Sequence, residues 1–507
     1  MKEDNAIRHG KFSITPSKEL HGELRLAGEG TQLSLHDTEE IQTISIPDNC
    51  ITGILHDRTR VTLMKCVTIN RSNSVSVNGE RYYSANLFPH FVVEGNQHIA
   101  PNEGIIREIS FVIEDATTLF YDFDAFSSLL DAAPYIDQLV SAQSKKVNRA
   151  ILTGPQPIIS YFTGKHDIIE IDTVLGKFRA KHNPLFDLGD LGGPRGVRIN
   201  NIISVSLETE NRIAFNEAMN RAFKLLRFLE VIIGRPQKVQ DLLMYAGNRE
   251  RPEPLKVHMS YSPALTANST LDSLSPQPAD LLLDPINRPE EFARVMRAWL
   301  EKDEARRDAR SQFYRSFAQQ RSYSLERLIG AANMFDILPI GAVPKDVKVS
   351  EDLKVARQHC KKIFKALPNS YERERVLVEL KKIGMATLKH KTKHRAGYII
   401  DAIGERFPDL VLVLDEAVNC RNHYVHGSVF NIDYNQNFNV VIFFTDTLEF
   451  VFAASELVEA GWNIRIFIEK GTTMSHPFGA YRVNYLGNLR ELKLLLRKSV
   501  TPAGDPS

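Results

Sequence analysis

The sequence lacks the features that mark secreted or membrane-spanning proteins. Its first residues, MKEDNAIRHGK, contain no apolar core of a signal peptide. The richest apolar stretch, Val440 to Val458, is interrupted by Asp446, Glu449 and Glu456, so we expect no transmembrane helix. We therefore predict a cytoplasmic protein that does not associate with a membrane.

The sequence also lacks paired cysteines. Its four cysteines are scattered and form no CxxC pair: Cys50, Cys66, Cys360 and Cys420. This excludes a disulfide framework and a zinc ribbon, and predicts buried, reduced thiols. His390 and His394 have the i, i+4 spacing of metal ligands, but Lys391 stands where a zinc protease has its glutamate. We predict neither a metal site nor a cofactor.

An excess of charge of either sign is missing as well. The 63 Lys and Arg residues balance 62 Asp and Glu residues, which leaves a net charge of +1 and no global attraction to nucleic acid or membrane. Binding to RNA therefore needs a local patch. The densest basic run supplies Lys389, Lys391, Lys393 and Arg395, which we expect to guide an RNA backbone; a solvated helix face or loop is the alternative interpretation.

The first part of the chain is rich in strand patterns. The 507 residues, 43% of them hydrophobic, allow two or three domains with sizeable cores. From Lys11 to about Leu207, apolar and polar residues alternate in short runs between turn residues, which predicts an antiparallel sandwich or barrel. A helix from about Asn211 to Ile233 follows, stopping at Gly234. We assign residues 1–247 to a β-rich N-terminal domain ending in helices.

The second part of the chain changes to a helical period. Residues 248–288 are rich in proline and serine and predict an exposed linker. Beyond it, apolar residues recur at i, i+3, i+4 and i+7, which predicts an all-α helical bundle over 289–499, apart from a short strand at Ile464 to Ile468. The last residues, 500–507, predict a disordered tail. The fold class expected is α+β multidomain.

One short stretch carries most of the functional information: Arg421, Asn422, His423, Tyr424, Val425 and His426, followed by Gly427. Two pairs in the chain place an arginine five to seven residues before a histidine, Arg421/His426 and Arg251/His258. The second pair encloses two prolines, which do not fit a helix interior, whereas an uninterrupted helical pattern precedes the first. Only Arg421/His426 has a scaffold.

These residue types suit metal-free cleavage of RNA. The 2′-hydroxyl of RNA is an internal nucleophile, so cleavage needs a proton acceptor, a proton donor and positive charge at the phosphorane. His426 suits acid or base work, Arg421 holds two phosphate oxygens while staying charged, and Asn422 positions the phosphate or the imidazole. Five helical steps separate Arg421 and His426 by about 140°, which the long arginine side chain and the nearby helix end relax.

The motif and its helical surroundings resemble the HEPN superfamily, in the form found in ApeA-type anti-phage proteins. Arg421, the polar Asn422 and His426 match the family motif, and the β-rich first half resembles the N-terminal region of that family. The resemblance implies a metal-independent endoribonuclease acting in abortive infection. It also implies a homodimer whose two motifs form one composite site. The products implied are 2′,3′-cyclic phosphate and 5′-hydroxyl ends.

The same resemblance implies partners: an RNA substrate, with tRNA among the candidates, and a phage-derived trigger sensed by the N-terminal domain. Two alternatives stay open. Arginine and histidine are also common near the C-terminal ends of helices, where they cap the helix, so Arg421 and His426 could have this role alone. A non-catalytic HEPN-type module for dimerisation, or for nucleotide or protein binding, is the rival function; carbohydrate binding by the β-rich domain is a third, weaker idea.

Overall fold

The structure, a computed structural model, describes residues 7–15, 18–41, 49–122, 124–187, 198–248, 251–260, 275–427 and 432–500. The chain divides into two compact units. A β-rich unit comprises Met1–Phe223, Gln237–Pro263 and Asp284–Pro289, and a helical unit comprises Lys224–Pro236, Ala264–Leu283 and Glu290–Ser507. The division falls inside helix α3 (Phe215–Ile233), so the chain passes between the units more than once.

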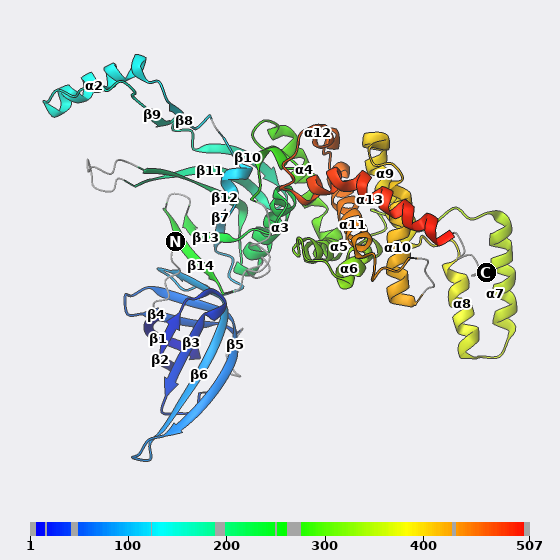
Figure 1. Ribbon diagram of the computed structural model, residues 1–507. Helices are drawn as coiled ribbons and strands as arrows, with labels where there is room; N and C mark the ends of the chain where they lie inside the picture. Colours follow the sequence, from blue (N-terminus) through cyan, green and yellow to red (C-terminus); the bar gives the residue numbers. More distant parts are fainter. Residues whose placement is uncertain are drawn as a thin grey trace. The chain divides into compact units, whose positions relative to one another are not determined.

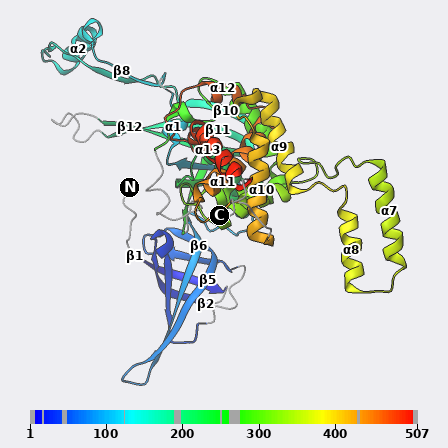
Figure 2. The ribbon, with the colours of Figure 1, turned by 45° about the vertical axis from the view of Figure 1, so that its right-hand side comes forward.

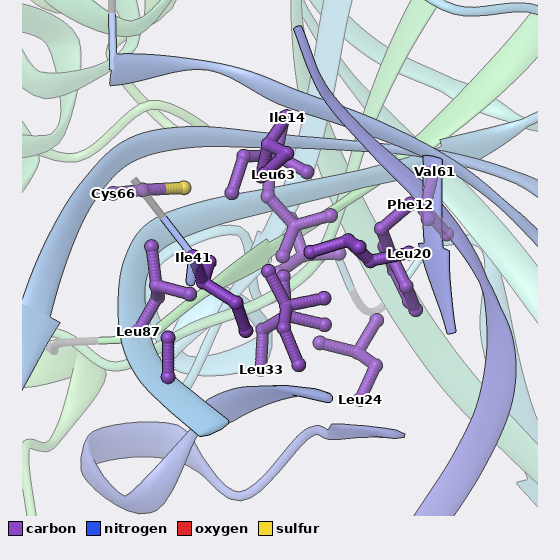
Figure 3. Close-up of a cluster of buried hydrophobic side chains, with 14 of the residues drawn as sticks. Phe12, Ile14, Leu20, Leu24, Leu33, Ile41, Val61, Leu63, Cys66 and Leu87 are labelled. Atoms are coloured by element: carbon purple, nitrogen blue, oxygen red, sulfur yellow. The ribbon is translucent and has the colours of Figure 1, made fainter. Parts of the chain in front are cut away.

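A closed β-barrel forms the first part of the β-rich unit. Its six strands are antiparallel and follow the order β6-β3-β2-β1-β4-β5, with β5 pairing back onto β6. Buried and more exposed residues alternate along β1, β2 and β3, because every second side chain of a strand points inward. Phe12, Leu24 and Leu33 belong to the barrel core (Figure 3). The strands are β1 (Ile7–Thr15), β2 (Lys18–Arg25), β3 (Gln32–Asp37), β4 (Ile51–Leu55), β5 (Arg60–Val75) and β6 (Arg81–Gly95).

A second part of the same sheet extends from β6. Its strands follow the order β6-β14-β13-β7-β12-β11-β10, and every neighbouring pair is antiparallel. A separate two-stranded sheet, β8 with β9, carries the helix α2 between its strands (Figure 2). The elements are β7 (Ile106–Ile113), α1 (Ala116–Leu119), β8 (Phe126–Leu129), α2 (Ala133–Val147), β9 (Ile159–Phe162), β10 (Asp167–Thr173), β11 (Gly176–Asp187), β12 (Arg198–Ile213), β13 (Val239–Asn248) and β14 (Arg251–Met259).

Strand β14 lies in the range that the sequence predicted as a linker. Prolines disfavour the interior of a sheet, yet Pro252 and Pro254 lie where β14 pairs with β13 alone. Pairing of β14 with β6 begins only at Lys256. The two prolines lack a backbone N–H, but on that side there is no hydrogen-bond ladder for them to interrupt. His258, the histidine of the rejected pair, lies 3.2 Å from Glu94. Residues 249–250 and 261–274 of the predicted linker, and 501–507 of the predicted tail, lie outside the described residues.

The helical unit is built around one buried helix, α11 (Phe438–Glu459), which contains the apolar stretch Val440 to Val458. Helices α5, α6, α9, α10 and α13 pack against it (Figure 1). Helices α7 and α8 form a hairpin and pack against each other. The other helices are α4 (Pro289–Glu301), α5 (Asp303–Phe317), α6 (Leu325–Asp336), α7 (Glu351–Ala366), α8 (Tyr371–Lys382), α9 (Leu388–Ile403), α10 (Leu410–His426), α12 (Ile464–Glu469) and α13 (Pro477–Val500).

The prediction of a β-rich domain followed by a helical bundle is therefore confirmed. The short strand predicted at Ile464 to Ile468 is wrong, since these residues form α12. A run of only five residues fits both the two-residue period of a strand and the 3.6-residue period of a helix. The two buried residues, Ile464 and Phe467, are three positions apart, which is the spacing of one helix face. Among the described residues, no helix is both long and apolar enough to span a bilayer.

Two of the acidic residues that interrupt the apolar pattern of α11, Glu449 and Glu456, are buried and paired. Glu449 accepts hydrogen bonds from Arg327 and from the Ser316 hydroxyl. Glu456 accepts from three arginines of other helices, which are Arg306, Arg310 and Arg395. Buried charges persist only when paired and hydrogen-bonded, so these contacts fix how α5, α6 and α9 pack on α11.

Asp446 provides a test of this buried polar core. The Tyr323 hydroxyl donates to Asp446 Oδ1 at 2.7 Å, and burial raises the pKa of Asp446 to about 7. Between about pH 4 and pH 7 the unfolded chain loses this proton while the folded chain keeps it, so stability falls as pH rises. We expect Asp446→Asn to remove this contribution and to stabilise the helical unit above pH 7.

The measurement is urea unfolding followed by tryptophan fluorescence at several pH values. Both tryptophans of the chain, Trp299 and Trp462, are buried in the helical unit and report its unfolding. Asp401→Asn, at an exposed position of α9, is the control. An unchanged difference between wild type and Asp446→Asn from pH 5 to pH 8 would contradict the assignment.

Candidate active site

Helix α10 holds the predicted motif at its C-terminal end. Its apolar face, including Val413, Leu414 and Ala417, is buried in the bundle, while its last residues reach the surface. Gly427 ends the helix with a positive φ of 68°, and its N–H donates to the His423 carbonyl at 2.9 Å. Glycine adopts this left-handed conformation without strain, so the helix stops directly after His426.

The guanidinium of Arg421 lies at the centre of the motif. Its Nη1 donates to Asn422 Oδ1 at 3.0 Å and lies 3.3 Å from His426 Nε2. The long arginine side chain thus bridges the 140° rotation between the two positions. The structure brings Arg421, Asn422 and His426 together at one helix end.

The contact with Arg421 also defines the state of the imidazole. A guanidinium has donors only, so Nε2 of His426 accepts the hydrogen bond through its lone pair. His426 is exposed, whereas Arg421 and Asn422 are half-buried. Nε2 of His426 is thus engaged by Arg421, and it can take a proton from a substrate hydroxyl once a substrate phosphate draws the guanidinium away.

Two neighbouring side chains are poor candidates for the second proton-transfer group. His423 packs its ring against Tyr424 and Tyr434, with ring centroids 5.1 and 6.1 Å apart. Burial raises the pKa of the Cys420 thiol to about 12, so this thiol stays protonated at neutral pH. His426 is the group of α10 that is placed for acid or base chemistry.

A fourth residue, which the sequence did not reveal, joins the site from helix α6. Arg421 Nη2 donates to Asn333 Oδ1 at 2.8 Å, across 88 positions of sequence. Asn333 is half-buried, and α6 packs on both α10 and α11. No spacing rule links the two positions, so only the packing of α6 against α10 reveals the contact. Asn333 and Asn422 hold the guanidinium from two sides.

Asn333 is expected to act as a positioning residue. Hydrogen bonds to charged groups contribute about 1.5–3 kcal/mol. Asn333→Ala removes one such bond from Arg421, so the guanidinium is held less well in its catalytic position. We therefore expect this variant to lower kcat roughly 10- to 100-fold. The measurement is single-turnover RNA cleavage, with thermal unfolding as a check on folding. Asn419→Ala, a half-buried asparagine of α10 that donates to Glu416, is the matched control. Equal rates for both variants would contradict this role.

The structure places the four predicted RNA-binding residues on α9 in different surroundings. Lys391 pairs with Asp336 and Lys393 with Asp415, at 3.2 and 2.8 Å. Lys389 is half-buried at the start of the helix. Arg395 is fully buried and pairs with Glu456 and Glu459, so its guanidinium does not face solvent. The basic run contributes three lysines to the surface, and its arginine belongs to the core.

The two histidines with metal-like spacing, His390 and His394, contact different neighbours. His390 Nδ1 lies 2.8 Å from the Thr387 hydroxyl at the start of α9, and His394 contacts Tyr398 edge-on. Within the part of the chain that the structure describes, no group of three or more His, Cys, Asp or Glu side chains is placed to hold a metal ion.

A helical bundle with an arginine, an adjacent asparagine and a histidine at the end of one helix defines a HEPN-type domain. Family models agree: an Apea-like HEPN domain matches residues 329–465, and ApeA N-terminal domain 1 matches residues 7–299. The second match covers more than half of the chain. The chain therefore belongs to the ApeA-like family of HEPN anti-phage proteins.

Family membership places the chain in anti-phage defence and gives it a nuclease-type HEPN domain. Domains of this kind commonly form dimers and act on RNA. Neither the curated proteins nor the solved structures contain a match to this sequence.

Proposed function

We propose that this chain is a metal-independent endoribonuclease that cleaves RNA during abortive infection. The observation that carries the proposal is the contact of Arg421 Nη1 with both Asn422 and His426 at the exposed end of α10. His426 acts as general acid or base, Arg421 binds the non-bridging phosphate oxygens, and Asn422 orients the guanidinium. The products are a 2′,3′-cyclic phosphate and a 5′-hydroxyl.

A complete site needs two copies of the chain. Cleavage requires one group that accepts the proton of the 2′-hydroxyl and another that donates a proton to the leaving oxygen. One motif offers one available imidazole, since His423 is packed between tyrosines. The end of α10 exposes His426 and the apolar Val425, which is 42% exposed. A homodimer that joins two such helix ends supplies both groups.

Lys389, Lys391 and Lys393 support the binding of the RNA backbone in this proposal. Lys393 pairs with Asp415 of α10, six residues before Arg421 and therefore about 9 Å from it along the helix axis. Helices α9 and α10 lie side by side (Figures 1 and 2). Arg395 is left out because it is buried. The β-rich unit senses a phage-derived trigger, and the activity is cytoplasmic, where tRNA is one candidate substrate.

The proposal is tested with purified wild type and His426→Ala incubated with total RNA in EDTA, with and without lysate of phage-infected cells. We expect wild type to fragment RNA and His426→Ala to leave it intact. An RNA with 2′-O-methyl groups at the cleaved positions should resist wild type, since the internal nucleophile is blocked. Intact RNA under every condition would favour the non-catalytic module instead.

A further inference from the structure

The β-rich unit contains a cavity that the proposed ribonuclease activity does not use. Its volume is about 900 Å³, and its walls come from β7, β10, β11, β12, β13, the β10–β11 turn and the first half of α3. This volume lies in the range of small-molecule binding sites, about 300–1,000 Å³. The lining is mainly polar and charged, with arginines and glutamates from several elements.

Two irregularities of the sheet meet at Arg107, on the cavity wall. Against β12, the register jumps from Glu208 opposite Glu108 to Ile213 opposite Ile106. Against β13, it moves from Tyr245 opposite Glu108 to Ala246 opposite Ile106. In the described ladders Arg107 therefore has no register partner on either side. Bulges of this kind re-aim side chains and are frequent beside binding sites.

Among the described residues, no acidic side chain neutralises the guanidinium of Arg107. Its Nε is buried without a hydrogen-bond partner, and no carboxylate of the described residues forms an ion pair with it. A second guanidinium, that of Arg221, reaches the cavity from α3. Its Nε donates to Glu217 and its Nη1 to the Leu175 carbonyl, both at 2.7 Å, and these two bonds leave Nη2 unused. Two guanidinium groups at one cavity suit a phosphate group.

A carboxylate and a phenol ring lie on the same row of the sheet. Glu108 is directly opposite Glu208 on one neighbouring strand and Tyr245 on the other. Glu208 is paired with Arg179 at 2.7 Å, but Glu108 has no ion pair among the described residues. Like charges opposite each other destabilise a sheet, so an unpaired glutamate here calls for a donor from elsewhere. A ligand ring with N–H groups supplies such donors and stacks on tyrosine.

We propose that this cavity binds a nucleoside phosphate, with the phosphate on Arg107 and Arg221 and the base against Glu108 and Tyr245. A free phosphate ion would fill only a small part of the cavity and would leave Glu108 unpaired. A nucleoside phosphate supplies both the anion and the ring donors. The proposal concerns the β-rich unit alone and does not depend on the ribonuclease activity.

The test is isothermal titration calorimetry of the full chain in the His426→Ala background, which we expect to leave RNA intact. The probes are the four ribonucleoside triphosphates and tripolyphosphate. We expect at least one nucleotide to bind with one site per chain. Arg107→Met should weaken it at least 10-fold, and Glu108→Gln should weaken the nucleotide but not tripolyphosphate. Arg60→Met, an exposed arginine of barrel strand β5, is the matched control and should change nothing.

Arg221→Met provides a second variant that leaves the sheet unchanged, in case Arg107→Met does not fold. Three results would overturn the proposal: no binding of any nucleotide, binding that Arg221→Met and Arg107→Met leave unaltered, or tripolyphosphate binding as tight as that of the nucleotides. Nucleotide bound at the motif of α10 instead would give the second of these results. None of them would affect the ribonuclease assignment, which is measured separately by RNA cleavage.

Discussion

His426→Ala is expected to lower the rate of RNA cleavage by about 10²- to 10⁴-fold, the range for removing a general acid or base. In a composite site both copies lose the imidazole, so the acceptor and the donor of protons disappear together. Folding should be intact, because a histidine near a helix end contributes about 1 kcal/mol at most sites. The variant should therefore also lose toxicity and phage protection while accumulating normally in cells.

The matched control for this experiment is His423→Ala. It removes an imidazole from the same last turn of α10, three residues earlier, but one whose ring packs on Tyr424 and Tyr434. We expect cleavage by this variant to stay within a few-fold of wild type. Full phage protection by His426→Ala, with His423→Ala inactive, would reverse the assignment of the two histidines.

Glu456→Gln should destabilise the helical unit by about 3–5 kcal/mol, the cost of breaking a buried ion pair by removing one partner. Glu456 is 2% exposed and neutralises Arg306, Arg310 and Arg395 from α5 and α9. An uncharged amide leaves these guanidinium groups buried with less compensation. Glu459 still pairs with Arg306 and Arg395, so Arg310, held otherwise by Asp303, loses most.

Urea unfolding monitored by the fluorescence of Trp299 and Trp462 measures this loss. The control is Glu379→Gln, which breaks the exposed pair of Glu379 with Lys382 on α8. Exposed pairs contribute about 0–1 kcal/mol, so the control should hardly shift the urea midpoint. Equal midpoints for the two variants would show that the buried network does not hold α5 and α9 on α11.

The sequence predicted what depends on neighbouring residues. The helical pattern before Arg421 located α10, and the alternation of Leu33 and Leu35 with polar residues located barrel strands. The motif was found for the same reason, since Arg421, Asn422 and His426 lie within one turn and a half of helix. Which strands close the barrel depends on the long-range pairings of β3 with β6 and of β1 with β4, which no local pattern shows.

The remaining features depend on contacts between distant parts of the chain. Asn333 reaches Arg421 only because α6 packs on α10. Arg395 has the same sequence surroundings as the three surface lysines, yet its side chain enters the core, where Glu456 and Glu459 lie. The prolines of β14 predict a linker because proline disfavours strands. The sequence does not show that β14 has a neighbour on one side only at these positions, which is why they are tolerated.

The chemistry of the RNA ends tests the central claim most directly. Purified wild type is incubated with RNA in EDTA, and the fragment termini are identified by mass spectrometry. The account predicts cleavage that survives chelation and leaves 2′,3′-cyclic phosphate and 5′-hydroxyl ends, because the 2′-hydroxyl is the nucleophile. Fragments with 3′-hydroxyl and 5′-phosphate ends, or cleavage that stops in EDTA, would contradict the roles given to Arg421 and His426.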